Sequence, residues 1–120
     1  MEHKDKHNAR FGAIQFISPE AIERGENWDN MTKEQKTKRD MWTVGVLIVM
    51  LLTGSPPFRG GSDKETLDNI KTRSIGGISE HEELKYISKQ AKNLVRQLLN
   101  LDVDERPTAK EALQHTWFRY

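Results

Sequence analysis

The strongest constraint on the fold is one long apolar run in the middle of a polar chain. Residues 41–52 read MWTVGVLIVMLL, and only Thr43 and Gly45 interrupt their apolar character. A helix of this composition has no polar face, which predicts a helix over about 38–53 that is buried all round. The β-branched residues make a strand the rival interpretation. A helix is preferred because the run is long for a strand and Gly54 supplies a C-cap.

The same run is too short to cross a membrane. It has 12 residues, fewer than the roughly 18–20 that a bilayer requires, and the first residues are charged where a signal peptide is apolar. The 120 residues include 19 basic and 18 acidic side chains, a net charge of +1, and no cysteine. We therefore expect a cytoplasmic chain without disulfides and without a nucleic-acid or membrane partner.

Helix-start signals recur along the chain. Ser18 can cap a helix that begins at Pro19 and Glu20, and capping-box patterns lie at Thr32–Gln35, Ser62–Glu65 and Thr108–Glu111. The clearest amphipathic helix covers 88–100. The predicted fold class is mainly α. The side chains expected to face inward on the later helices are Leu67, Ile70, Ile87, Ala91, Leu94, Val95, Leu98, Leu99, Ala109, Ala112 and Leu113.

Sequence patterns that would carry chemistry are missing from the chain. The four histidines lack the spacing of a zinc site, and 102–113 lacks the glycine and the final glutamate of a calcium loop. No glycine pair is followed by the Lys-Ser/Thr of a phosphate-binding loop. The residues therefore predict no metal site and no catalytic residue in this chain.

Three segments in order resemble protein kinases. Residues 12–20, GAIQFISPE, resemble the G-T-x-x-Y-x-A-P-E end of the kinase activation segment. Residues 40–58 resemble the D-x-W-S-x-G-V central helix and the G-x-P-P-F turn after it. Residues 104–118, DERPTAKEALQHTWF, resemble the end of a kinase domain. Within the family, the chain is most similar to calcium/calmodulin-dependent and calcium-dependent Ser/Thr kinases.

The resemblance implies a helical fragment of the C-terminal, large lobe of a protein-kinase-like fold. Residues 11–120 would form this partial lobe, and 1–10 would be a tail at the end of the activation segment. The glycine-rich loop, the H-R-D loop and the D-F-G motif are not in the sequence. ATP and magnesium are thus implied only for an intact parent, and this chain alone is expected to be inactive.

The resemblance also assigns roles to particular residues. Glu20 and Arg106 would form a buried ion pair, with two separate surface charges as the alternative. Asp40 would belong to the scaffold, or else serve only as a charge at a helix N-terminus. The remaining scaffold residues are Trp42 and Gly45. The substrate-positioning residues would be Gly12, Ala13, Phe16, Ile17 and Ser18, although Phe16, Ile17 and Ser18 could equally be core and cap residues.

Departures from the family pattern leave two functions open. Ala13 stands where Ser/Thr kinases have a Thr that contacts the catalytic Asp, Phe16 replaces Tyr, and Ser18 replaces Ala. The chain is either part of an active Ser/Thr kinase, or a truncated kinase or pseudokinase lobe that binds proteins without catalysis. Its expected partners are a protein substrate or the upstream kinase half. Self-association through exposed apolar surface is a further expectation.

Overall fold

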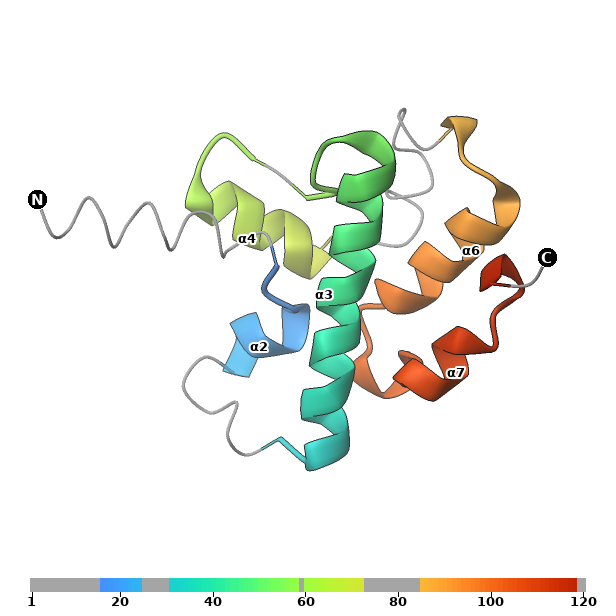
Figure 1. Cartoon of the computed structure of the whole chain (residues 1–120). Coiled ribbons are helices and arrows are strands. Elements are labelled where there is room, and N and C mark those ends of the chain that lie inside the picture. Colours follow the sequence, from blue (N-terminus) through green and yellow to red (C-terminus); the bar gives the residue numbers. More distant parts are fainter. Residues whose placement is uncertain (1–15, 25–30, 59, 73–84, 119–120) are drawn as a thin grey trace, which may run out of the picture.

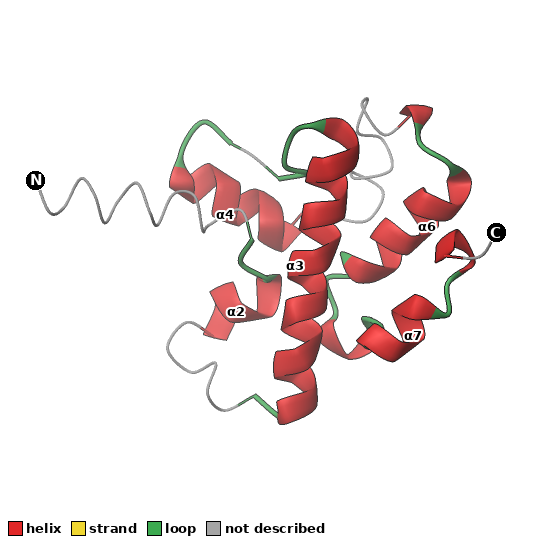
Figure 2. Ribbon diagram, viewed as in Figure 1, coloured by secondary structure: helices red, strands yellow, loops and turns green. Residues whose placement is uncertain are grey.

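A computed structural model describes residues 16–24, 31–58, 60–72 and 85–118. Every regular element in these ranges is a helix, which confirms the mainly α prediction (Figure 2). The helices are α2 (Pro19–Arg24), α3 (Lys33–Thr53), α4 (Asp63–Thr72), α6 (Lys89–Leu98) and α7 (Ala109–Leu113), with 3-10 turns η3 (Val103–Glu105) and η4 (Thr116–Phe118). None of these helices is long and apolar enough to cross a membrane.

Helix α3 forms the centre of the fold, with α2 and α4 on one side and α6 and α7 on the other (Figure 1). It begins at a complete capping box, in which Thr32 and Gln35 each accept a backbone N–H from the other. It ends at Gly54, whose φ of 82° is left-handed. The predicted start near residue 38 was wrong. Residues 33–40 hold no breaker, so the capping box begins the same helix as the apolar run.

The prediction that this helix is buried all round was also wrong. Trp42, Val46 and Val49 are buried in the main core, but Leu51 is 83% exposed and Leu47 is 44% exposed. α6 and η3 contact α3, while Leu47 and Leu51 lie on a part of its surface that the described elements leave exposed. This result agrees with the expectation of exposed apolar surface.

Two further capping boxes were predicted at the starts of α4 and α7, and only the box at α7 is complete. At α7, Thr108 and Glu111 cap each other as predicted. At α4, Ser62 accepts from the Glu65 N–H, but the Glu65 carboxylate accepts from the Gly61 N–H at 3.0 Å instead of reaching back to Ser62. The predicted box at α4 is therefore only half formed, since the Glu65 carboxylate binds the Gly61 N–H.

The inward faces of the smaller helices follow the predictions in part. α6 starts at the Ser88 cap and buries Ala91, Leu94, Val95 and Leu98 as expected. In α4, Ile70 is buried, but Thr66 takes the second fully buried place and Leu67 is only half-buried. In α7, only Ala112 is buried, while Leu113 is 66% exposed. The short α7 has too few turns to bury a complete stripe.

Gly45 allows α3 to pack closely against Leu98 and Leu99 at the end of α6. A Cβ at this position would lie 2.8 Å from Leu99 Cδ2 and 2.9 Å from Leu98 Cβ. We expect Gly45→Ala to lower the free energy of unfolding by about 1 kcal/mol or more, since overpacking exceeds the gain in helix propensity. Urea denaturation checks this, with the exposed Thr37→Ala as control. Increased stability of the Gly45 variant, as propensity alone predicts, would contradict the close packing.

Candidate functional site

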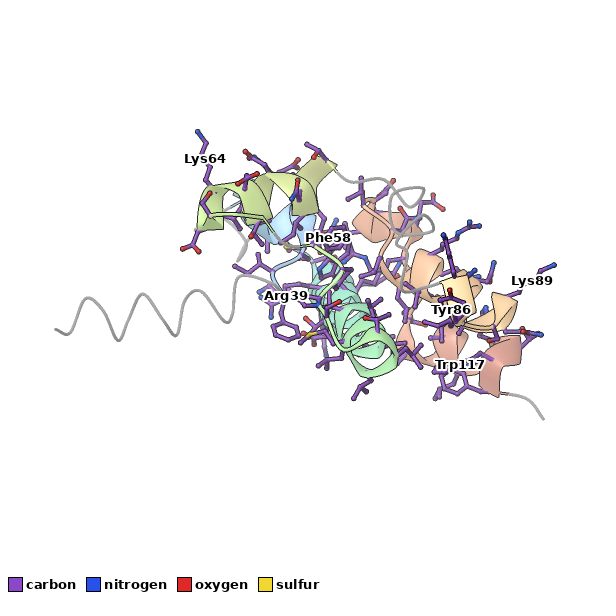
Figure 3. All side chains as sticks on the ribbon, turned by 90° about the horizontal axis from the view of Figure 1, so that it is seen from above. Arg39, Phe58, Lys64, Tyr86, Lys89 and Trp117 are labelled. Atoms are coloured by element: carbon purple, nitrogen blue, oxygen red, sulfur yellow. The ribbon has the colours of Figure 1, made fainter. Side chains whose placement is uncertain are left out.

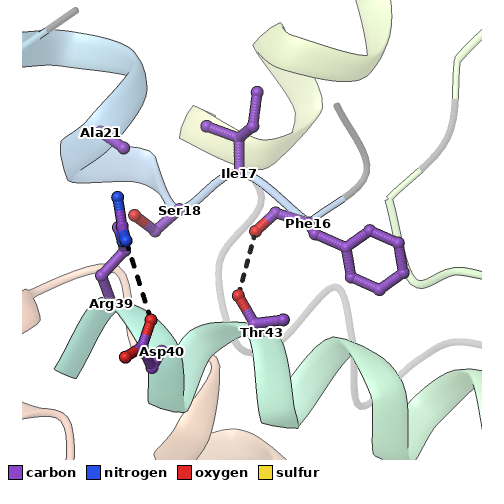
Figure 4. A pocket seen from close by; sticks show the side chains of 7 residues that line it. All are labelled: Phe16, Ile17, Ser18, Ala21, Arg39, Asp40 and Thr43. Carbon is purple, nitrogen blue, oxygen red and sulfur yellow. Dashed lines mark hydrogen bonds and ion pairs between the residues drawn. The ribbon is translucent and has the colours of Figure 1, made fainter. Parts of the chain in front are cut away.

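A short non-helical segment, residues 16–18, crosses α3 before α2 begins (Figure 4). The Thr43 hydroxyl donates a hydrogen bond of 3.5 Å to the Phe16 carbonyl, and Arg39 Nη2 lies 3.8 Å from Asp40 Oδ1. Between segment and helix is a hollow of about 210 Å³. It is lined by Phe16, Ile17, Ser18, Ala21, Arg39, Asp40 and Thr43. The hollow thus combines apolar walls with one cation and one carboxylate.

The segment continues into α2, which is anchored to the far end of the chain. Arg106 Nη1 donates to Glu20 Oε2 at 2.8 Å, and Arg106 Nη2 donates to Glu20 Oε1 at 2.9 Å. The two side chains are 86 positions apart in sequence and almost completely buried. The structure therefore brings Glu20 and Arg106 together in a two-pronged ion pair, and the alternative of two separate surface charges was wrong.

The buried guanidinium has a partner for every donor. Besides Glu20, it donates to the Lys38 carbonyl at 3.0 Å and twice to the Asn100 carbonyl, at 3.1 and 2.9 Å. These bonds use all five N–H groups of arginine. Its Cζ atom also lies 5.1 Å from the Trp42 ring centroid. Arg106 consequently ties together α2, α3 and the turn that follows α6.

The ion pair makes stability depend on pH. Burial by itself raises the pKa of Glu20, but the hydrogen bonds and charge of Arg106 outweigh it, so the pKa lies below its usual value. The pair's contribution is therefore complete above the unfolded pKa of about 4.3 and is lost as pH falls through the lower folded value.

We expect the stability advantage of the native chain over Glu20→Gln to shrink as pH falls from 7 through this window. Urea midpoints of both chains across the pH range measure the difference. Other carboxyls, such as that of Glu111 with its lowered pKa, titrate in both chains and cancel. A difference that stays constant down to the lowest pH would contradict a charged Glu20 in the folded state.

The scaffold residues occupy distinct places on α3. Trp42 is fully buried and stacks on Phe58, with ring centroids 5.5 Å apart and planes 9° apart. Asp40 is exposed at the hollow and is the eighth residue of α3. The alternative that Asp40 is a charge at the helix N-terminus was wrong, because the helix begins seven residues earlier.

Sequence reasoning missed part of the hollow. Gly12 and Ala13 lie outside the described residues, so their predicted roles stay predictions. Thr43 and Arg39 were not singled out, although Thr43 follows Asp40 by three positions and therefore shares its helix face. That spacing is the signal that could have identified Thr43.

The helical architecture and this site define part of the large lobe of a protein kinase. The family described as "Protein kinase domain" matches residues 1–118. The chain belongs to this family.

Several relatives support the assignment. The chain is 37% identical over 109 residues to a calcium and calcium/calmodulin-dependent serine/threonine-protein kinase of Oryza sativa, covering 91% of this chain and 19% of that protein. It is 38% identical over 114 residues to the human myosin light chain kinase family member 4, covering 95% and 27%. The chain thus spans about a fifth to a quarter of these curated relatives.

Solved kinase structures have the same fold. The Rad53 kinase domain with SCD2 matches with a TM-score of 0.72 and 30% identity, covering 88% of this chain and 36% of that one. The twitchin kinase region from C. elegans matches with a TM-score of 0.70 and 32% identity, covering 91% and 18%. The predicted kinase-lobe fold is therefore confirmed.

The residues present do not fit magnesium and ATP. In the ranges that the structure describes, no three His, Cys, Asp or Glu side chains are grouped to hold a metal ion. The sequence also lacks the H-R-D and D-F-G motifs through which kinases place a catalytic base and magnesium. No step of phosphoryl transfer is assigned to this chain.

Proposed function

We propose that the chain is the substrate-side part of the large lobe of a Ser/Thr protein kinase. The observation that carries this proposal is the fixed position of residues 16–18 across α3, between the Thr43 hydrogen bond and the buried Glu20–Arg106 pair. The intact parent would transfer phosphate from ATP to protein Ser or Thr, in the cytoplasm. The relative from Oryza sativa favours a calcium/calmodulin-dependent type of kinase.

In this proposal, the hollow beside the segment receives a side chain of the peptide substrate. Phe16 and Ile17 are half-buried, so each keeps part of its apolar surface for a ligand. Arg39 and Asp40 stand at the polar side of the same hollow. A volume of about 210 Å³ suits one side chain rather than a whole ligand. The segment would therefore position an extended peptide and leave the chemistry to other parts of the kinase.

Binding of a degenerate peptide library with a central Ser or Thr to the full chain tests this role. We expect Ile17→Asp to abolish the binding, because a carboxylate replaces apolar surface at the hollow. Leu51→Asp is the matched control, since it makes the same kind of change at a site that does not line the hollow. Equal binding by both variants would reject the substrate-positioning role. Circular dichroism shows whether each variant is folded.

The second candidate function is a non-catalytic protein-binding lobe, and one surface favours it. An apolar groove of about 240 Å³ lies between α3, α6, α7 and η4. Its lining is entirely apolar: Met41, Val44, Ile48, Leu94, Leu98, Ala109, Ala112, Leu113 and Phe118. Exposed apolar surface of this kind is typical of an interface. In the kinase proposal the upstream half covers it, whereas in the alternative a separate protein does.

Under either proposal, the isolated chain lacks the partner that would cover its apolar surface. We expect the purified chain to self-associate in light scattering at high concentration, and Leu47→Glu with Leu51→Glu to shift it toward monomer. Both leucines are exposed on α3, so the change should not disturb the core. A native chain that stays monomeric at every concentration would contradict this expectation.

A further inference from the structure

One histidine links the C-terminal turn η4 to α6. The Trp117 backbone N–H donates a hydrogen bond of 3.0 Å to His115 Nδ1, and His115 Nε2 lies 2.7 Å from Asn93 Oδ1 on α6. A backbone N–H can only donate, so Nδ1 must be unprotonated and Nε2 must carry the proton of a neutral imidazole. His115 Nε2 therefore donates to Asn93, and the neutral ring connects the two elements.

The surroundings hold the ring in this state. Asn93 Oδ1 also accepts from Gln97 Nε2 at 2.9 Å, so two donors fix the amide oxygen toward the ring. Among the described residues, no charged side chain forms an ion pair or hydrogen bond with His115. The nearest charged residues along these elements are Lys89, Lys92 and Arg96 on α6 and Lys110 and Glu111 on α7. The link between η4 and α6 therefore depends on the protonation of the ring itself.

A second proton on the ring would break one of its two hydrogen bonds. Histidine side chains gain this proton in mildly acid solution, and His115 is half-buried, so solvent reaches it. Both ring nitrogens of a protonated histidine are donors. The bond from Nε2 to Asn93 is then kept, but Nδ1 carries a hydrogen that faces the Trp117 N–H. Acid therefore removes the hydrogen bond to the η4 backbone and leaves two donors opposed.

We propose that His115 is a pH-sensitive switch, whose protonation loosens η4 and exposes more of the apolar groove between α3, α6, α7 and η4. Phe118 of η4 lines that groove. Trp117, labelled in Figure 3, packs against a buried cluster of Met41, Leu94, Leu98 and Ala112. A single hydrogen bond changes an equilibrium by about two- to tenfold, so the open form should increase by this factor. The switch acts on the groove and goes beyond substrate positioning at the hollow.

Amide hydrogen exchange of the full chain, followed by NMR between about pH 8 and about pH 5, tests the proposal. After correction for the intrinsic pH dependence of exchange, we expect the protection of the Trp117 amide to fall about two- to tenfold in acid. The Gly54 amide, bonded to the Met50 carbonyl at 2.8 Å, reports any general unfolding. Binding of the apolar-surface dye ANS should rise over the same pH range.

Two variants assign the effect to the ring. In His115→Asn, the side-chain oxygen can accept the N–H two residues on and does not titrate, so Trp117 protection and dye binding should stay constant with pH. Asn93→Asp places a carboxylate against Nε2, which favours the protonated ring, so the change should move to higher pH. Asn69→Asp makes the same substitution on α4 and should leave the change where it is.

Three outcomes would overturn the proposal. The first is Trp117 protection that stays constant in the native chain down to acid pH. The second is an equal loss in His115→Asn, which would assign the titration to another group. The third is an unshifted response in Asn93→Asp, which would contradict the contact between Asn93 and Nε2. None of these variants changes Ile17 or the hollow, so failure of the switch is distinguishable from failure of the substrate-positioning role.

Discussion

Arg106→Ala is expected to lower the free energy of unfolding by about 3–5 kcal/mol. The substitution leaves the Glu20 carboxylate buried without its cation, and it removes the donors that satisfy the Lys38 and Asn100 carbonyls. It also removes the cation from the Trp42 ring. Equilibrium urea denaturation measures the loss. Breaking an ion pair at the surface would cost only about 0–1 kcal/mol. The size of the loss in stability therefore shows whether the Glu20–Arg106 pair is buried.

Two further variants distinguish the loss of the ion pair from nonspecific destabilisation of the fold. Lys110→Ala removes an exposed cation from α7 and should change stability by less than about 0.5 kcal/mol. Glu20→Leu combined with Arg106→Met removes both charges, and should restore much of the stability lost by Arg106→Ala. An Arg106→Ala cost below about 1 kcal/mol would contradict the buried pair.

Trp42→Ala is the second substitution with a large expected effect, a loss of about 3–5 kcal/mol. Trp42 has the largest of the fully buried side chains. It stacks on Phe58 and lies against Arg106, so its removal leaves a cavity beside these two side chains. The cost depends on how far those neighbours collapse into the space. Thermal and urea unfolding both report it.

The indole nitrogen gives this second prediction a sharp control. No side chain or backbone group in the described ranges accepts a hydrogen bond from Trp42 Nε1. Trp42→Phe therefore loses volume but no described hydrogen bond, and should cost clearly less than Trp42→Ala. Tyr86→Ala, at an exposed ring, should be close to neutral. If Trp42→Phe cost as much as Trp42→Ala, the cost would not follow the volume removed, which would contradict packing as the source of the stability.

Local signals in the sequence predicted some of the helix starts, because capping is a contact between residues three positions apart. The predicted cap at Ser18 was wrong, since its buried hydroxyl has no hydrogen-bond partner among the described residues. Thr32 and Thr108 cap their helices as expected. The exposure of Leu47, Leu51 and Leu113 could not be predicted in the same way, because burial depends on which distant elements cover a face. An apolar run in the sequence does not show how much of the helix surface is covered by other elements.

The candidate site was predicted through resemblance rather than through spacing. No local pattern joins Glu20 to Arg106 across 86 positions, and only the ordered kinase motifs linked them. Thr43 and Arg39 were missed because only Asp40 and Trp42 were assigned roles from the family pattern. The hollow, however, is also lined by Arg39 and Thr43, which lie on the same turn of α3 as Asp40. The role of Ala13 stays a prediction.

The central claim is that this chain is one part of a larger Ser/Thr kinase. The most direct measurement is the intact mass of the protein isolated from the cells that make it. We expect a mass several-fold above 13.9 kDa, with H-R-D and D-F-G peptides preceding these residues in the same polypeptide. A native mass close to 13.9 kDa would contradict the claim and would favour a non-catalytic lobe whose apolar groove holds another protein.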